Sequence, residues 1–204
     1  MTDTADAIFG SSRVMAILRN MDPAHATELA HRAWDLGIEL VEVPIQSADA
    51  LPTLQTVVAA GLERGKRVGS GTVISLDHLN ASRAAGAAFT VAPGFDRAVV
   101  AESARIGLPH LPGVATATEI QRAIAEGCTW VKAFPATVLG TAWFTTMSGP
   151  FPQLAFVATG GIDASNTAAF LEAGVSMVAV GSALSDPAQV ERLAQLVAGH
   201  SRKE

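Results

Sequence analysis

Cysteine and lysine are scarce in this sequence, and positive charge nowhere collects into a run. Only one of the 204 residues is cysteine, Cys128, which excludes an intramolecular disulfide. The net charge is −5, which argues against nucleic acid or an anionic membrane surface as the main partner. A small soluble ligand fits this composition better.

Long apolar runs and metal-binding or nucleotide-binding motifs are also missing. The run at 175–181 stops far short of the ~20 residues of a membrane-spanning helix, and the N-terminus lacks the segments of a secretory signal. We therefore expect a cytoplasmic protein that does not bind membranes. The five histidines have no metal-binding spacing, and no GxGxxG follows the first predicted strand. Neither a metal nor a dinucleotide site is expected, and His110 is interpreted as a satisfied core residue.

What the sequence does have is a regular alternation of helical and strand-like segments. At 49% hydrophobic content it can bury a large core, and we expect one domain, 1–204, with its core at about 10–200. Glycine near the end of a helical segment is followed by an unbroken apolar run, typical of strands buried on both faces. The eight predicted strands lie within 14–18, 34–44, 66–73, 83–94, 104–113, 124–135, 154–161 and 171–182. Eight such units indicate a parallel (β/α)8 TIM barrel, and an open doubly wound sheet is the alternative.

Three helix starts are marked by capping residues. Asp22 and Asp186 are each followed by proline, which suits an N-cap and the first helical position. Thr116 stands three residues before Glu119, the spacing of a capping box.

Lys132 stands inside the apolar stretch TWVKAFPA at 129–136. An isolated buried ammonium costs several kcal/mol, so the group needs a partner or a lowered pKa. At the carboxyl end of a barrel strand, beside Trp130 and Phe134, a neutral amine could attack a ketone and form a Schiff base. The alternative is a structural lysine paired with Glu42.

Glu42, within LVEVP at 40–44, is the only carboxylate inside any of the apolar strand runs. A Schiff-base reaction needs a group that carries protons during carbinolamine formation, dehydration and bond cleavage, and one carboxyl can serve these steps. The alternative role is to neutralise Lys132 or Arg19.

Small-residue turns follow the last two predicted strands. They contain Gly160 with Gly161, and Gly181 with Ser182, at the positions where barrel enzymes frequently bind phosphate. Backbone N–H groups at glycine can approach phosphate oxygens closely, although each pair alone could mark only a tight turn. Arg19, at the end of the first strand, could hold a carboxylate or be a solvated cation.

With these residues in place, the chain resembles the 2-keto-3-deoxy-6-phosphogluconate (KDPG) aldolase family, which includes 4-hydroxy-2-oxoglutarate and 2-keto-3-deoxy-6-phosphogalactonate aldolases. The resemblance covers nearly the whole chain. The motifs that carry it are AILR (16–19), VEVP (41–44), GSGTV (69–73), VAPG (91–94), PGVATATE (112–119), VKAFPA (131–136), GPFPQLAFVATGGI (149–162) and VGSAL (180–184).

The resemblance implies a class I aldolase barrel with Lys132 as the Schiff-base lysine and Glu42 as the acid/base. Substrate would be bound by Arg19, Thr72, Pro93, Phe134 and Thr159, and phosphate by Gly160, Gly161, Gly181 and Ser182. Members of this family are typically homotrimers that need neither metal nor organic cofactor.

Two positions leave the substrate epimer open. Some members carry an arginine for the substrate carboxylate where this chain has Gln46, and the segment 41–47 is similar to that of galactonate aldolases. Thr159 favours the gluconate enzymes instead. Gln46 is kept among the substrate-binding residues.

The sequence therefore predicts reversible cleavage of 2-keto-3-deoxy-6-phosphogluconate to pyruvate and glyceraldehyde 3-phosphate. The galactonate epimer with the same mechanism is an alternative. Two others are a phosphosugar isomerase or epimerase without a covalent step, and a non-catalytic barrel that binds a phosphorylated metabolite.

Overall fold

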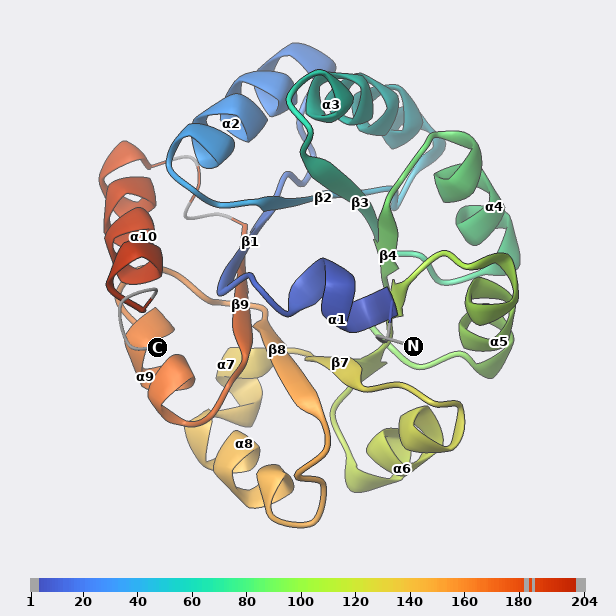
Figure 1. Ribbon diagram of the computed structural model, residues 1–204, viewed down its shortest axis with the longest axis vertical. Coiled ribbons are helices and arrows are strands. Elements are labelled where there is room, and N and C mark those ends of the chain that lie inside the picture. Colours follow the sequence, from blue (N-terminus) through green and yellow to red (C-terminus); the bar gives the residue numbers. More distant parts are fainter. Residues whose placement is uncertain (1–3, 182–183, 185, 201–204) are drawn as a thin grey trace.

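Short parallel strands form a ring that is surrounded by helices (Figure 1). The computed structural model describes residues 4–181, 184 and 186–200. The strands are β1 (Val14–Ile17), β2 (Leu40–Pro44), β3 (Arg67–Gly71), β4 (Phe89–Val91), β5 (His110–Leu111), β6 (Gly113–Val114), β7 (Trp130–Ala133), β8 (Ala155–Thr159) and β9 (Met177–Val180). The helices are α1 (Thr4–Phe9), α2 (Pro23–Asp35), α3 (Leu51–Glu63), α4 (Leu76–Ala84), α5 (Arg97–Ile106), α6 (Ala117–Ala125), α7 (Ala136–Leu139), α8 (Thr141–Ser148), α9 (Thr167–Glu172) and α10 (Pro187–His200), with a 3-10 turn η1 at Ala48–Ala50.

The strand order β5-β4-β3-β2-β1-β9-β8-β7-β6 is that of a barrel opened at one seam. The seam lies at Pro112, which separates β5 from β6. β5 pairs with β4, and β6 pairs with β7, so the predicted fifth strand is present but split into two short pieces. Proline has no N–H to donate to a strand ladder, which accounts for the break at this residue. The predicted parallel barrel is confirmed, with nine strands in place of eight among the residues that the structure describes.

The three predicted helix starts are confirmed. The Asp22 carboxylate accepts a hydrogen bond from the His25 N–H at 3.0 Å, and the Asp186 carboxylate accepts one from the Ala188 N–H at 2.9 Å. Thr116 and Glu119 form a reciprocal capping box at the start of α6. These caps satisfy N–H groups that have no partner within the helix.

Alternate residues of the strands build two apolar cores. One core lies between the strands and the surrounding helices, and the other fills the barrel interior. The interior core contains Met15, Ile17, Leu40, Phe89, Val91, Leu111, Trp130, Val157, Met177 and Ala179. Because side chains alternate along a strand, the next inward positions toward the carboxyl end belong to the same interior.

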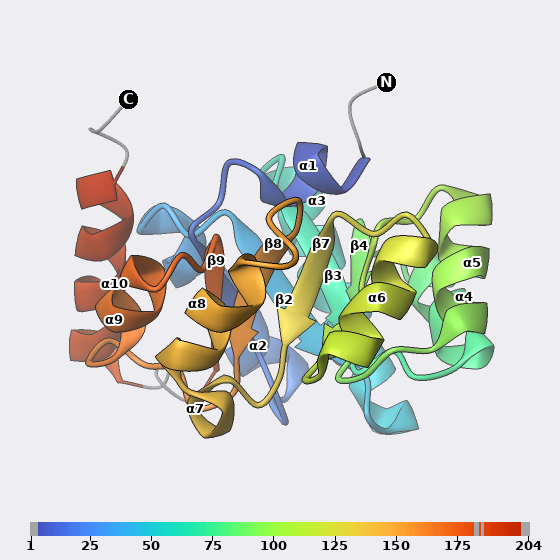
Figure 2. The ribbon, with the colours of Figure 1, turned by 90° about the horizontal axis from the view of Figure 1, so that it is seen from below.

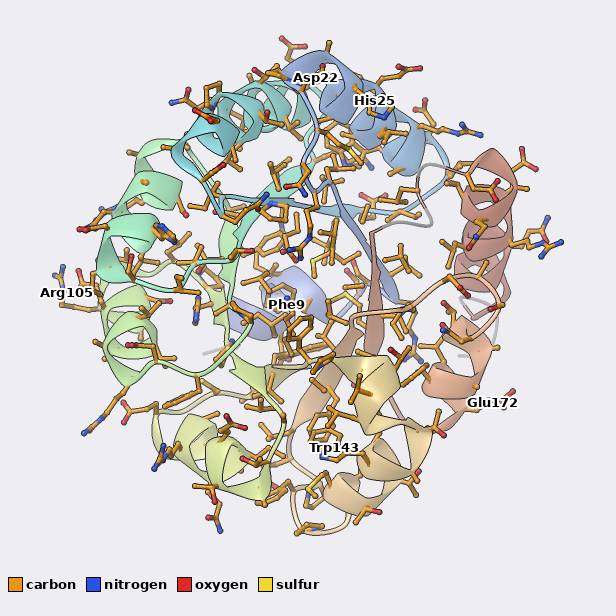
Figure 3. The ribbon with its side chains drawn as sticks, turned by 180° about the vertical axis from the view of Figure 1, so that it is seen from behind. Phe9, Asp22, His25, Arg105, Trp143 and Glu172 are labelled. Carbon is orange, nitrogen blue, oxygen red and sulfur yellow. The ribbon has the colours of Figure 1, made fainter. Side chains whose placement is uncertain are left out.

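Helix α1 closes the N-terminal end of the barrel (Figures 1 and 2). Phe9 is completely buried and lies at the centre of the ring of strands in Figure 3. Its ring centroid is 5.3 Å from that of Phe89 and 5.7 Å from that of Trp130. The Trp130 indole N–H donates to Asp6 at 2.6 Å, which fixes the helix. The expected core boundary near residue 10 therefore leaves out an element that fills the interior.

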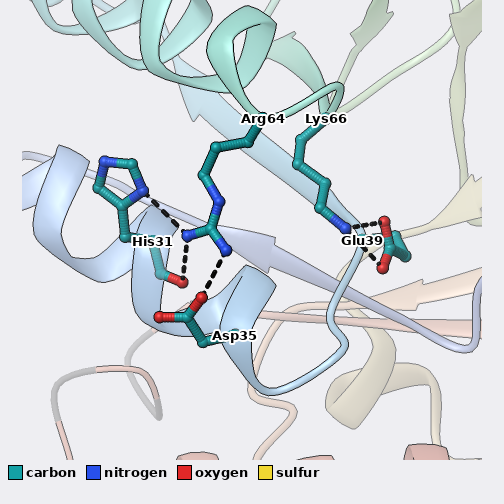
Figure 4. A network of polar contacts seen from close by, with 5 residues as sticks. All are labelled: His31, Asp35, Glu39, Arg64 and Lys66. Carbon is teal, nitrogen blue, oxygen red and sulfur yellow. Dashed lines mark hydrogen bonds and ion pairs between the residues drawn. The ribbon is translucent and has the colours of Figure 1, made fainter.

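A polar network on the outside joins α2 to the end of α3 and the start of β3 (Figure 4). Arg64 donates to Asp35 at 2.5 Å and contacts Nδ1 of His31 at 3.1 Å, while Lys66 pairs with Glu39 at 2.7 Å. These side chains are partly exposed, so each pair stabilises the fold by about 1 kcal/mol or less. None of the described helices is long and apolar enough to cross a membrane.

Candidate active site

Three polar side chains are buried at the carboxyl ends of strands on the inner face of the barrel. They belong to Glu42 of β2, Lys132 of β7 and Thr159 of β8, which are 1%, 2% and 2% exposed. Each follows an interior apolar residue by two positions, so strand alternation turns each one inward. The barrel interior is thus apolar near α1 and polar at the opposite end.

Lys132 lies in surroundings that lower the pKa of its amine. Its Nζ lies 5.1 Å from the centroid of the Phe134 ring. Burial lowers the pKa of Lys132, the Glu42 charge opposes this shift, and the nearby Arg19 adds to it. The group therefore loses its proton at a lower pH than a lysine in water.

Glu42 is held without a direct polar partner. Neither carboxylate oxygen accepts or shares a hydrogen bond among the described residues, so the direct pairing with Lys132 considered from the sequence is not formed. Burial raises the pKa of Glu42, and the charges of Lys132 and Arg19 oppose that shift. A Cβ at Gly71 would lie 1.8 Å from Glu42 Oε1, so the carboxyl occupies space that only glycine leaves free.

A cavity of about 340 Å³ opens at the carboxyl end of the barrel, beside Thr159 and Phe134, and neither Lys132 nor Glu42 is among its lining residues. Its lining includes six residues predicted from the sequence: Arg19, Phe134, Thr159, Gly160, Gly161 and Gly181. The remaining lining residues are Ile17, Asn20, Met21, Ile162 and Ala179. The hydroxyl of Thr159 is buried and has no partner among the described residues, so it is available to a ligand. We call this space the mouth cavity.

The turn after β8 is built on two glycines with positive φ. Gly160 has φ +100° and Gly161 has φ +75°, conformations that other residues rarely adopt. A Cβ at Gly161 would lie 2.4 Å from Thr137 Oγ1, and the Thr137 N–H donates to the Gly160 carbonyl at 3.2 Å. The close approach of α7 therefore also requires glycine at this turn.

The other predicted site residues occupy different places. Thr72 follows β3 with φ +59°, half-buried, and Pro93 follows β4, where its backbone would meet a Cβ on Gly113 at 2.2 Å. Gln46 lines a neighbouring cavity and not the mouth cavity. Ser182 lies outside the described residues.

His110 differs from the sequence interpretation. Its Nδ1 lies 2.8 Å from the Thr90 hydroxyl, but its buried Nε2 has no partner among the described residues. Burial lowers the pKa of His110 to about 4, while the charge of Asp96 opposes the shift. The hydrogen-bonding capacity of His110 is therefore only half used, because only Nδ1 of the ring lies near a partner.

Sequence reasoning missed Asn20 and Met21, which line the mouth cavity directly after Arg19. The only available signal was their position at the end of the first strand, where a barrel places its site. In the part of the chain that the structure describes, no group of three His, Cys, Asp or Glu side chains could hold a metal ion.

An amine, a carboxyl and a hydroxyl buried at the carboxyl end of a parallel barrel define a barrel enzyme. The sequence profile of KDPG and KHG aldolase matches residues 5–196. The chain belongs to this aldolase family and is an aldolase-type carbon–carbon lyase.

Individual relatives agree with this assignment. The 2-dehydro-3-deoxy-phosphogluconate aldolase of Treponema pallidum is 36% identical over 181 residues, which cover 87% of this chain and 83% of that protein. The 2-dehydro-3-deoxy-6-phosphogalactonate aldolase of Escherichia coli is 30% identical over 187 residues, 91% of each chain. The KDPG aldolase of Legionella pneumophila, solved with pyruvate captured as a covalent carbinolamine, has a TM-score of 0.83 and 28% identity, covering 97% of this chain and 98% of that one.

Proposed function

We propose that this chain is a class I aldolase that reversibly cleaves 2-keto-3-deoxy-6-phosphogluconate to pyruvate and glyceraldehyde 3-phosphate. The observation that carries the proposal is the burial of Lys132 and Glu42 in the barrel interior, where each charge influences the pKa of the other group and burial shifts the two pKa values in opposite directions. Burial favours the neutral form of both groups, which are the amine that attacks a ketone and the carboxyl that can donate a proton.

The reaction begins with attack of the Lys132 amine on the C2 ketone to give a carbinolamine. Protonated Glu42 donates to the departing hydroxyl, water leaves, and an iminium forms. The Glu42 carboxylate then accepts the proton of the C4 hydroxyl. The C3–C4 bond breaks, its electrons enter the iminium to form an enamine, and the aldehyde is released.

The enamine is protonated at C3, and water then hydrolyses the resulting iminium to release pyruvate and the free amine. Phe134 and the buried Thr159 hydroxyl line the space around the reacting carbons, and Arg19 attracts the substrate carboxylate. Phosphate would bind at Gly160, Gly161, Gly181 and Ser182, far from the reacting carbons, and would fix the orientation of the substrate.

Two observations support the covalent step. A solved relative, the KDPG aldolase of Legionella pneumophila, has pyruvate bound as a carbinolamine. In this chain, the lowered pKa of Lys132 increases the fraction of nucleophilic amine near neutral pH.

The test is intact mass and peptide mapping after sodium borohydride treatment with pyruvate. The protein should gain a pyruvate-derived adduct at Lys132, and the adduct should vanish in Lys132→Ala. The matched control is Lys66→Ala, which removes a partly exposed lysine paired with Glu39 and should leave the adduct unchanged. Turnover of the substrate without any adduct would contradict the covalent mechanism.

The galactonate epimer is the second candidate substrate, because relatives of both names match this chain at similar identity. Both epimers would use the same Lys132 chemistry and differ at the C4 hydroxyl. The ratio of kcat/KM for the two purified epimers decides between them, and a higher value for the galactonate compound would replace the gluconate assignment.

We further propose that the chain is one barrel domain that assembles as a homotrimer in the cytoplasm. The family resemblance supports the trimer, and the composition supports the location. Light scattering during size-exclusion chromatography should give about three times the chain mass of 21.0 kDa. A mass equal to one chain would contradict the trimer.

A further inference from the structure

A second cavity lies beside the mouth cavity, behind the loops that follow β1 and β2. It has a volume of about 220 Å³, and its polar lining includes the exposed Ser47 and Asp49 and the buried Thr53. Asn20 and Met21 line both cavities. These two residues therefore form the partition between the cavities.

Two hydrogen bonds and one backbone conformation hold the partition in place. The Gln46 side-chain amide donates a hydrogen bond to Asn20 Oδ1, so the Gln46 amide already has a partner within the protein. The Thr53 hydroxyl, itself buried, donates to the Met21 backbone carbonyl at 3.1 Å. Asn20 has φ +56°, a left-handed conformation that asparagine tolerates better than most residues. Both residues of the partition are thus fixed by neighbours in the second cavity.

The second cavity has the chemistry of a site for hydroxyl groups. Asp49 gives it a carboxylate, which repels a phosphate or a second carboxylate but accepts hydrogen bonds from hydroxyls. Ser47 adds a hydroxyl that can donate or accept. The glycine turns proposed for phosphate lie in the mouth cavity, on the other side of the partition.

We propose that Asn20 and Met21 limit the chain length of the aldehyde, and that the second cavity is a hydroxyl-binding subsite that they separate from the mouth cavity. This inference rests on the proposed aldolase function. The C2 carbon of pyruvate would be bound to Lys132, and the phosphate of the aldehyde would be bound at the turn after β8. With both ends fixed, an extra carbon in the aldehyde must bulge sideways. The partition blocks a bulge toward β1 and β2, whereas the space behind it would accept one.

The test compares two aldehydes in aldol addition to pyruvate, glyceraldehyde 3-phosphate and the one-carbon-longer erythrose 4-phosphate. Asn20→Gly removes the partition side chain, and glycine adopts φ +56° readily. The kcat/KM ratio of the longer to the shorter aldehyde should rise about tenfold or more, the size of effect expected for one carbon in a fitted pocket. Met21→Ala should shift the ratio in the same direction.

Matched variants separate size from other effects. Asn20→Asp keeps the size and the Oδ1 acceptor, and its ratio should equal that of the wild type. Adding Asp49→Leu to Asn20→Gly removes the carboxylate of the second cavity and should reverse the gain. A gain that survives Asp49→Leu would overturn the hydroxyl subsite.

The two proposals fail in different ways. An unchanged ratio in Asn20→Gly and Met21→Ala, with turnover of glyceraldehyde 3-phosphate retained, would overturn the partition alone. Absence of wild-type turnover and of a borohydride adduct with pyruvate would overturn the aldolase function, and the partition inference with it.

Discussion

The ring of His78, on α4, contacts the backbone carbonyl of Thr72 through Nδ1 at 3.2 Å. A carbonyl oxygen only accepts hydrogen bonds, so Nδ1 is the donor. Thr72 is β-branched and has φ +59°, a backbone conformation that such residues rarely adopt. His78 therefore stabilises a strained residue at the carboxyl end of β3, where the proposed substrate pocket lies.

We predict that His78→Ala raises KM for the keto acid about tenfold with a smaller effect on kcat, because Thr72 moves relative to the bound substrate. Steady-state kinetics of cleavage measure this split. His78→Asn keeps a donor near the Nδ1 position and should restore much of the loss. His25→Ala removes an exposed histidine of α2 as a control, and equal effects of both alanine variants would refute the role of the contact.

Glu42→Gln should lower kcat by about 100-fold or more, the usual contribution of a positioned acid or base. The amide is of similar size but cannot carry the proton between steps. Borohydride trapping with pyruvate should become slow and should not be lost, since Lys132 remains. An unchanged kcat would remove Glu42 from the mechanism.

Gly71→Ala tests the position of the Glu42 carboxyl without changing its chemistry. The new Cβ would lie 1.8 Å from Glu42 Oε1, so the carboxyl must move by an ångström or more. Such a displacement should lower kcat/KM about 100-fold. Gly94→Ala is the matched control, because a Cβ there meets no atom within 4 Å, and its activity should stay near that of the wild type.

Gly161→Ala should lower kcat/KM more for phosphorylated substrates than for unphosphorylated 2-keto-3-deoxy sugar acids. The added Cβ meets Thr137 Oγ1 at 2.4 Å and would displace the turn proposed to bind phosphate. Gly174→Ala is the control for backbone strain. Gly174 also has a positive φ, +91°, but a Cβ at this position would meet no atom within 4 Å. Equal loss of kcat/KM on both substrate types in Gly161→Ala would contradict a phosphate site here.

His110 should make the fold sensitive to mild acid. Its pKa is lowered from 6.5 to about 4, so the unfolded chain binds a proton that the folded chain excludes between these values. The free energy of unfolding should therefore decrease as pH falls from about 6.5 to 4. At about pH 4.5 the loss is on the order of 2 to 3 kcal/mol relative to neutral pH.

Urea unfolding of the wild type and His110→Asn at both pH values measures this contribution. Asparagine can still bond Thr90 but does not titrate. The wild type should lose more stability than the variant on acidification, and equal losses would assign the acid sensitivity to other groups.

The strand positions and the inward direction of Lys132 and Glu42 could be predicted from the sequence. Side chains alternate along a strand, and a charged group within an apolar run needs a partner or a shifted pKa, so few arrangements are possible. Polar residues inside apolar runs are conspicuous in a sequence. The same reasoning could not find the partition, since the contacts of Asn20 with Gln46 and of Met21 with Thr53 join separate loops. Contacts of that kind depend on tertiary structure and leave no periodic signal.

Two further features could not be predicted from the sequence pattern. Helix α1 is only six residues long, below the length at which sequence periodicity is informative, and its place depends on contacts of Phe9 and Asp6 with distant strands. The orphan nitrogen of His110 depends on what surrounds one ring atom. No property of the sequence near His110 reports that environment.

The helix that fills the N-terminal end of the barrel has a consequence for protons in the proposed reaction. With Phe9 packed against Phe89 and Trp130, the N-terminal end of the barrel is closed, which leaves the carboxyl end, where the substrate would sit, as the side from which water reaches Glu42. Bound substrate would then isolate the carboxyl from exchange with solvent. The proton taken from the C4 hydroxyl would then stay on Glu42 and remain available to protonate C3 of the enamine.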